Sequence, residues 1–291
     1  MGRGLMILHA SHTTTYSYSG AVSLCQTEVR LKPRTCGGQH LLEHRVIVDP
    51  EPLAVATRTD FFGNELSRFT IDEPHTSLRI AATSVIENNH AEAIHPALTP
   101  PWEQVRNAVR EHRTCAMFAA FQFTIESPRI PLTRAFADYA SASFVANRPI
   151  LQCAIDLCGR IFADFKYDRE ATTVTTSVEQ ALRTRRGVCQ DFAHVMIACL
   201  RVLGLPARYV SGYLRTGENA VGATGSHAWL AMYCPGFDWL DIDPTNNVIP
   251  SADHVTLGWG RDYSDVPPVK GVVLGGGHQT VAVEVRVTGP E

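Results

Sequence analysis

The segment RRGVCQDFAHVMIACLRVLGLPARYVSGY, residues 185–213, contains a cysteine between a glycine turn and a helical pattern. After Cys189, apolar residues recur at the spacing of a helix that packs one face against a core. The pattern ends at Gly204, and Pro206 beyond it is a typical stop signal. The run ARYVSGYL that follows is typical of a strand. Cys189 is therefore expected in the first turn of a helix.

The position of Cys189 would favour its thiolate form. The helix dipole is positive at this end, and the first backbone N–H groups have no partners within the helix. A free cysteine can equally be a small core residue, so position alone leaves both explanations open. The chain has eight cysteines but no Cys-x-x-Cys pair and no export signal. We therefore expect reduced thiols and no structural zinc site.

Composition limits the classes of function. The 291 residues are 45% hydrophobic, which is enough for one large core or two to three smaller ones. The net charge of -3 and the lack of a lysine or arginine run argue against a nucleic-acid partner. No signal-like stretch and no run of 18 apolar residues is seen, so we expect a cytoplasmic protein without a membrane partner.

The first part of the chain has the pattern of a β domain. Short apolar and aromatic runs are separated by turn residues, and charged residues alternate with apolar ones over residues 28–32. We predict an N-terminal β-sandwich over residues 1–90. His9 and His12 have no third ligand type beside them and are expected on the strand surface.

The remainder is expected to be a connector followed by a core. Residues 91–149 are rich in proline and contain helix-like pieces, which indicates a helical and irregular connector. Residues 150–291 begin with a helical pattern, continue through the helix at Cys189 and three strands joined by short connections, and end in one more strand. Such connections favour an antiparallel sheet. The predicted fold class is α+β, with the helix of Cys189 packed on that sheet.

A histidine and a carboxylate stand at the ends of two neighbouring strands. His227 opens one run and Asp243 closes the next, and an antiparallel pair would bring these ends together. A reactive thiol needs such a base, and the base needs an orienting group. Asp241, two positions earlier, competes for the last role, and each residue could instead be a surface or turn residue. Cys189, His227 and Asp243 are not a common zinc set, so no metal is expected.

Three segments carry a family resemblance: GVCQDFAHVMIACLRVLGLPARYVSGY, SHAWLAMYCPGFDWLDIDPTNN and HTTTYSYSGAVSLCQTEVRLKPR. They resemble bacterial transglutaminase-like proteins, whose core is related to papain-like cysteine proteases. The likeness is strongest over residues 150–247, and the β part resembles the domain that often precedes this core. In that family the cysteine, the histidine of HAW and the aspartate of DPT form a catalytic triad. The resemblance thus implies that Cys189, His227 and Asp243 are catalytic and chooses Asp243 over Asp241.

The resemblance implies a thioester acyl-enzyme, a peptide or protein amide substrate and no cofactor. It leaves hydrolysis and transfer to an amine open, with hydrolysis favoured. Some relatives have lost the triad, so a non-catalytic binding or scaffolding protein is the alternative. A homo-oligomer is compatible with either function.

Three neighbours of the triad are supporting candidates. Asp191 is expected to hold the start of the helix through backbone N–H groups. Tyr213 and Trp229 would either wall the substrate cleft or fill the core. His194 lies five residues after Cys189, on a different helix face, and is a poor base for it.

Overall fold

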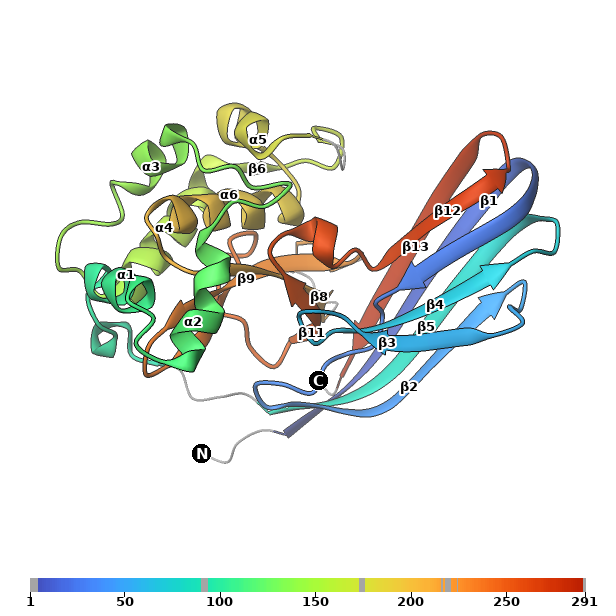
Figure 1. Cartoon of the computed structure of the whole chain (residues 1–291), viewed down its shortest axis with the longest axis horizontal. Helices are drawn as coiled ribbons and strands as arrows, with labels where there is room; N and C mark the ends of the chain where they lie inside the picture. Colours follow the sequence, from blue (N-terminus) through green and yellow to red (C-terminus); the bar gives the residue numbers. More distant parts are fainter. Residues whose placement is uncertain are drawn as a thin grey trace.

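The computed structural model describes residues 5–89, 94–172, 176–215, 217, 221–223 and 225–289. An antiparallel sheet lies at one end of the molecule, and a helical core with a second sheet lies at the other (Figure 1). The chain starts in the first sheet, crosses to the core and returns to the first sheet with its last two strands. None of the described helices has the length and apolar character needed to span a membrane.

The first sheet is built around one long strand. Its strands within the described residues are β1 (Leu5–Val29), β2 (Gln39–Asp49), β3 (Val55–Thr59), β4 (Glu65–Ile71), β5 (His75–Asn89), β12 (Val269–Gly275) and β13 (Gln279–Thr288). β1 pairs with β5 and then β4 on one edge, and with β13 and then β12 on the other. Every pairing is antiparallel. β2 extends the sheet beyond β5, and β3 extends it beyond β4.

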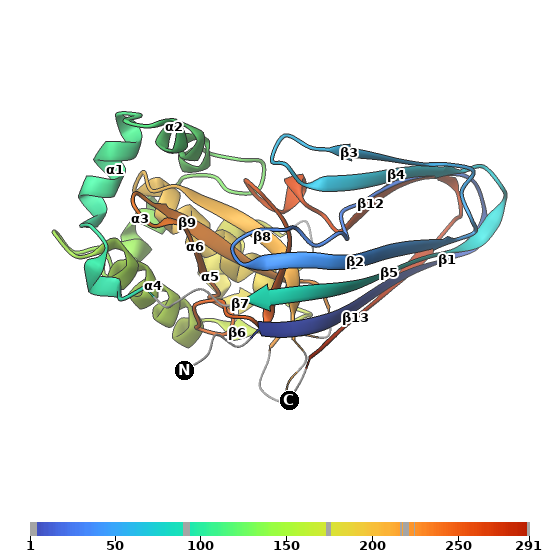
Figure 2. The same ribbon diagram turned by 90° about the horizontal axis from the view of Figure 1, so that it is seen from below.

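A bend in β1 curls this sheet over itself. The register with β5 shifts between Ser17 and Val22, and in Figure 2 β3 and β4 form a layer above β2, β5 and β13. Phe69 of β4 and Ile80 of β5 are buried in the same apolar cluster. The expected sandwich is thus one curled sheet rather than two separate ones. Alternation shows that a strand is half-buried, but it does not show that one strand serves both layers.

The last two strands lie outside the part of the chain in which the sequence analysis placed them. We grouped residues 150–291 as one core, but β12 and β13 pair with β1. The alternating pattern of residues 279–288 predicts a strand correctly and contains no information about its partner. The placement of the C-terminal strand in the core was therefore wrong.

Helices surround the second sheet. They are η1 (Pro96–Leu98), α1 (Trp102–Arg110), α2 (Cys115–Phe121), η2 (Gln122–Thr124), α3 (Arg134–Ala140), α4 (Ile150–Asp164), α5 (Val178–Thr184), α6 (Cys189–Val202) and η3 (Tyr263–Asp265). Val109 of α1 and Phe136 of α3 are fully buried in one cluster with residues of α6. The predicted connector therefore packs into the core.

The second sheet has the order β10-β9-β8-β11 and is antiparallel throughout. Its strands are β8 (Ala207–Leu214), β9 (His227–Cys234), β10 (Asp238–Ile242) and β11 (His254–Gly260). α6 packs on one face of this sheet, as expected, and β6 (Lys166–Tyr167) pairs in parallel with β7 (Arg186–Gly187) just before α6. The α+β class is confirmed.

Strand β11 is the junction between the two parts. Asn88 at the end of β5 donates to the backbone of the segment that enters β11, and Gln39 of β2 bonds both backbone groups of Thr256. Asn64, just before β4, bonds both backbone groups of Trp259. Side chains of the first sheet thus hold β11 along its length.

A buried arginine ties α6 to three segments, and we expect its loss to destabilise the fold. The guanidinium of Arg201, 1% exposed, donates to the carbonyls of Ala207, Ile125 and Arg261. Arg201→Leu leaves these acceptors without their donor, and it should lower the free energy of unfolding by about 3 kcal/mol or more. Urea unfolding measures the change. Arg183→Leu, on the exposed face of α5, is the control and should change it by less than about 0.5 kcal/mol. A small change for Arg201→Leu would contradict the prediction.

Candidate active site

Cys189 is the first residue of α6, and its neighbours Gly187 and Asp191 lie in close contact with each other. Oδ2 of Asp191 accepts hydrogen bonds from the backbone N–H of Val188 (2.8 Å) and from Oγ1 of Thr172 (2.7 Å). This is the capping contact expected of Asp191. A Cβ on Gly187 would lie 2.5 Å from that same Oδ2, so only glycine fits there. The spacing of glycine, cysteine and aspartate is therefore required by the way the helix starts.

The hairpin of β9 and β10 brings histidine and aspartate together. His227 is the first residue of β9, and Asp243 directly follows β10. Nε2 of His227 lies 2.8 Å from Oδ2 of Asp243, and both side chains are fully buried. Asp241 makes no such contact and instead lines a hollow with Arg208. The structure thus places Asp243, and not Asp241, beside the imidazole.

The carboxylate of Asp243 accepts five hydrogen bonds. The donors are the backbone N–H groups of Thr245 (2.9 Å) and Asn246 (3.3 Å) at Oδ1, and His227 Nε2 (2.8 Å), Asn246 Nδ2 (2.8 Å) and His254 Nε2 (3.2 Å) at Oδ2. Burial acts to raise the pKa of Asp243, but the charge of His227 and these donors outweigh it and hold the pKa far below its usual range. Asp243 is therefore an anion at any physiological pH.

This anion favours the charged form of His227. Burial acts to lower the pKa of His227, but Asp243 and the nearby Cys189 sulfur raise it to about 10. Cys189 is 7% exposed, and its Sγ lies 3.9 Å from the carbonyl oxygen of Ser226, the residue before the histidine. His227 can therefore carry a proton beside this sulfur.

Only one ring nitrogen of His227 is hydrogen-bonded to Asp243. We predicted Asp243 at one nitrogen and the Cys189 thiol in or slightly beyond hydrogen-bond reach of the other. Nε2 bonds Asp243, whereas Nδ1 has no hydrogen-bond partner within the described residues. A Cβ on Gly222 would lie 2.8 Å from Nδ1, so this glycine leaves space beside it. Nδ1 is thus available to exchange a proton with the thiol.

Tyr213 does not line this site. Its hydroxyl lies 3.1 Å from Nδ1 of His12 on β1, and its ring packs among buried residues of the first sheet. Of the two explanations left open for Tyr213, core filling is the one that the structure supports. His12 is buried as well, which corrects the expected surface position, and burial lowers its pKa to about 4. His9 is exposed as expected. Strand alternation alone could not show that the core would cover one face of β1 here.

Trp229 supports the site from within the core. It is fully buried on β9, and its ring centroid lies 6.0 Å from that of His227 and 5.2 Å from that of His254. A Cβ on Gly212 would come within 2.3 Å of this ring, so glycine is needed opposite it. Trp229 therefore packs against two imidazoles and is not an exposed cleft wall.

His254 and Asn246 were not among the predicted site residues. His254 begins β11 and carries no spacing signal that links it to Cys189, His227 or Asp243, while Asn246 lies in the DPTNN segment without an assigned role. The ligand atoms of His227, Asp243 and His254 lie within 4.8 Å of one another, and these residue types can hold a metal ion. Their N···O distances of 2.8 and 3.2 Å are those of hydrogen bonds. We therefore describe the group as a hydrogen-bonded network.

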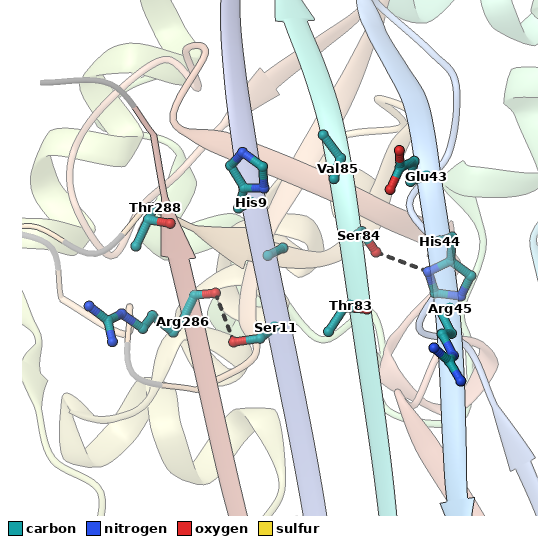
Figure 3. Close-up of a pocket in the computed structure, with 11 residues that line it drawn as sticks. His9, Ser11, Glu43, His44, Arg45, Thr83, Ser84, Val85, Arg286 and Thr288 are labelled. Carbon is teal, nitrogen blue, oxygen red and sulfur yellow. Dashed lines mark hydrogen bonds between the residues drawn. The ribbon is translucent and has the colours of Figure 1, made fainter.

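A separate hollow lies on the first sheet. It has a volume of about 550 Å³ and crosses β13, β1, β5 and β2 (Figure 3). Basic side chains from three of these strands line it: His9, Arg45 and Arg286. Nδ1 of His44 bonds Oγ of Ser84 at 2.9 Å. None of Cys189, His227 and Asp243 borders this hollow, so it is not part of the site.

Comparison with known proteins identifies the family. A model of the bacterial transglutaminase-like N-terminal region matches residues 8–87, and a model of the transglutaminase-like superfamily matches residues 142–244. An uncharacterized protein of Mycobacterium tuberculosis is 37% identical over 290 residues, covering 95% of this chain and 90% of that protein. The chain belongs to the transglutaminase-like superfamily. Membership in this superfamily indicates a cysteine-dependent enzyme, and it confirms the resemblance seen in the sequence.

One solved structure shares the fold, and a further relative matches a short segment of the chain. A structure described as a "Putative Cysteine Protease" from Cytophaga hutchinsonii has a TM-score of 0.79 at 20% identity, covering 99% of this chain and 92% of that one. It shows that the whole fold is shared. A protein-glutamine gamma-glutamyltransferase of Pseudomonas aeruginosa is 38% identical over 73 residues, which is 23% of this chain and 11% of that protein.

Proposed function

We propose that this transglutaminase-like protein is an acyl-transfer enzyme that cleaves amide or peptide bonds through a thioester on Cys189. The observation that carries the proposal is the buried His227–Asp243 pair beside the first residue of α6. The proposed substrate is a peptide or protein, with no nucleic-acid or membrane partner. A binding or scaffolding function would require neither the ionised carboxylate nor the free ring nitrogen.

The chemistry begins from the ion pair in which the Cys189 thiol has already passed its proton to Nδ1 of His227. The resulting imidazolium is stabilised by Asp243, and the thiolate by the positive end of α6. The thiolate forms an S–C bond with the amide carbonyl carbon, and the carbonyl oxygen gains negative charge. Neither the Cys189 nor the Gln190 backbone N–H donates a hydrogen bond within the described part of the chain. We propose these groups as donors to that oxyanion.

The second half of the reaction regenerates the thiol. His227 gives its proton to the leaving nitrogen as the C–N bond breaks, which leaves a thioester on Cys189. An incoming water then loses a proton to His227 as its oxygen bonds to the thioester carbon. The C–S bond breaks, the acid is released, and His227 returns the proton to the Cys189 sulfur. We propose water as the main acceptor because it needs no binding site of its own, whereas an amine acceptor does.

Selective alkylation tests whether Cys189 is activated. Burial raises the pKa of six other thiols: Cys25, Cys36, Cys153, Cys158, Cys199 and Cys234. Cys115 is exposed and is the first residue of α2, but no His–Asp pair contacts it within the described residues, so it is an internal control. At pH 6, iodoacetamide should label Cys189 at least about tenfold faster than Cys115, despite its burial. Peptide mass spectrometry gives the rates, and equal slow labelling would favour the binding function.

Activity profiling separates the possible reactions. The protein is incubated with a peptide library, with and without an amine acceptor, and both hydrolysis and amine incorporation are measured. Cys189→Ala should lose both, and Cys115→Ala should keep both. Products made equally by Cys189→Ala would overturn the proposed function.

A further inference from the structure

We propose that His254 is a positioning residue that holds the Asp243 carboxylate against His227, and that Asn88 of the first sheet holds His254 in turn. This inference deepens the proposed function and rests on it. Nε2 of His254 lies 3.2 Å from Oδ2 of Asp243, the same oxygen that bonds His227. The carboxylate is therefore shared by two imidazoles on different strands.

The tautomer of His254 follows from its other nitrogen. The backbone N–H of Ser251 donates to Nδ1 at 3.4 Å, so Nδ1 accepts and the ring proton lies on Nε2. The backbone N–H of His254 returns a hydrogen bond to the Ser251 carbonyl at 3.0 Å. This turn fixes the ring with its only N–H directed at Asp243. His254 can thus donate to the carboxylate without being charged.

The turn itself is held by the first sheet. Nδ2 of Asn88, at the end of β5, donates to the carbonyls of Ala252 (2.9 Å) and His254 (3.0 Å). Asn88 is buried, with 6% exposed. A continuous hydrogen-bonded chain therefore runs from the N-terminal sheet through His254 to the triad carboxylate. Through this chain of hydrogen bonds, the N-terminal sheet helps to position the Asp243 carboxylate.

Among the described residues, four side chains face His254 or act on it. Asp243 bonds it, the ring of His227 lies 6.0 Å from its ring, and Trp229 packs edge-on at 5.2 Å. The charge of Asp241 on β10 also acts on it. Without His254, Asp243 keeps its other hydrogen-bond donors, so its carboxylate should stay ionised. We expect this carboxylate to be held less firmly in place. His227 would then hold its proton less strongly.

The experiment measures the rate of Cys189 alkylation by iodoacetamide from pH 5 to pH 10, which requires no substrate. His254→Leu should slow alkylation at pH 7 about ten- to hundredfold and move the onset of fast alkylation to higher pH, because a His227 that holds its proton less strongly stabilises the thiolate less. His254→Gln, which places an amide N–H near the position of Nε2, should restore most of the rate. Asn88→Ala should shift the profile in the same direction by a smaller amount. Asn64→Ala is the matched control, because it removes bonds from the far end of β11, and its profile should match the wild type.

The outcomes are distinct. An unchanged pH profile in His254→Leu, or an onset of fast alkylation that moves to lower pH, would overturn the positioning function. Equal loss in His254→Leu, His254→Gln and Asn64→Ala would show general destabilisation and would also overturn it. If wild-type Cys189 is not labelled faster than Cys115, the proposed function fails first. That result is visible before any His254 variant is made.

Discussion

Cys189→Ala is expected to reduce amide cleavage to the background rate, a loss of about 10⁴-fold or more. The alanine has no atom that can form the thioester, so the two-step pathway is closed. His227→Ala should be nearly as severe, because the imidazole both activates the thiol and protonates the leaving nitrogen. The measurement is kcat/KM on a peptide selected in the library experiment. Both changes remove side chains, so unfolding in urea should be measured in parallel.

The double variant adds a sharper criterion. Residues that act in one step are not additive, so Cys189→Ala with His227→Ala should be scarcely slower than Cys189→Ala alone. Cys115→Ala, which removes an exposed thiol at another helix start, serves as the control and should remain active. Full activity in His227→Ala, on a substrate that Cys189→Ala cannot cleave, would remove the histidine from the mechanism.

Asp243→Asn is expected to reduce kcat/KM by about 10² to 10⁴-fold, the upper end being the loss seen when the aspartate of a serine triad is changed in this way. The amide loses the charge that stabilises the His227 imidazolium. It also replaces one acceptor oxygen with an NH₂ group, although three donors converge on Oδ2 and two on Oδ1. At least one donor must then face another donor. The variant should therefore lose stability as well as activity.

The pH dependence of the Asp243→Asn variant and a matched control test whether the carboxylate is assigned correctly. Asp243 raises the pKa of His227, so in Asp243→Asn the imidazolium should be lost at lower pH. Because this imidazolium stabilises the thiolate, fast alkylation of Cys189 should begin at higher pH than in the wild type. Asp241→Asn is the matched control because it changes the neighbouring carboxylate, which does not contact the imidazole. Near wild-type activity is expected for it. A larger loss in Asp241→Asn than in Asp243→Asn would show that the carboxylate was assigned wrongly.

Local sequence patterns were sufficient to predict the parts of the site that lie on elements close together in the chain. The helical period after Cys189 predicts α6 and places the thiol at its start. The hairpin from His227 to Asp243 closes within a few residues, so alternation and one short turn predict that its ends meet. These contacts depend on short-range geometry, which the order of residues encodes directly.

Other features depended on which distant segments pack together. The same alternation that reveals β13 as a strand cannot show that it pairs with β1, more than 250 residues earlier in the chain. It also cannot show that His254 reaches Asp243, or that Asn88 holds the turn before β11. Buried polar groups must find hydrogen-bond partners wherever the folded chain provides them. The sequence by itself therefore predicted the candidate thiol, histidine and carboxylate and the elements that carry them. Only the tertiary structure decided which further side chains hold them in place, because those bonds form between surfaces that exist only after the two sheets have packed.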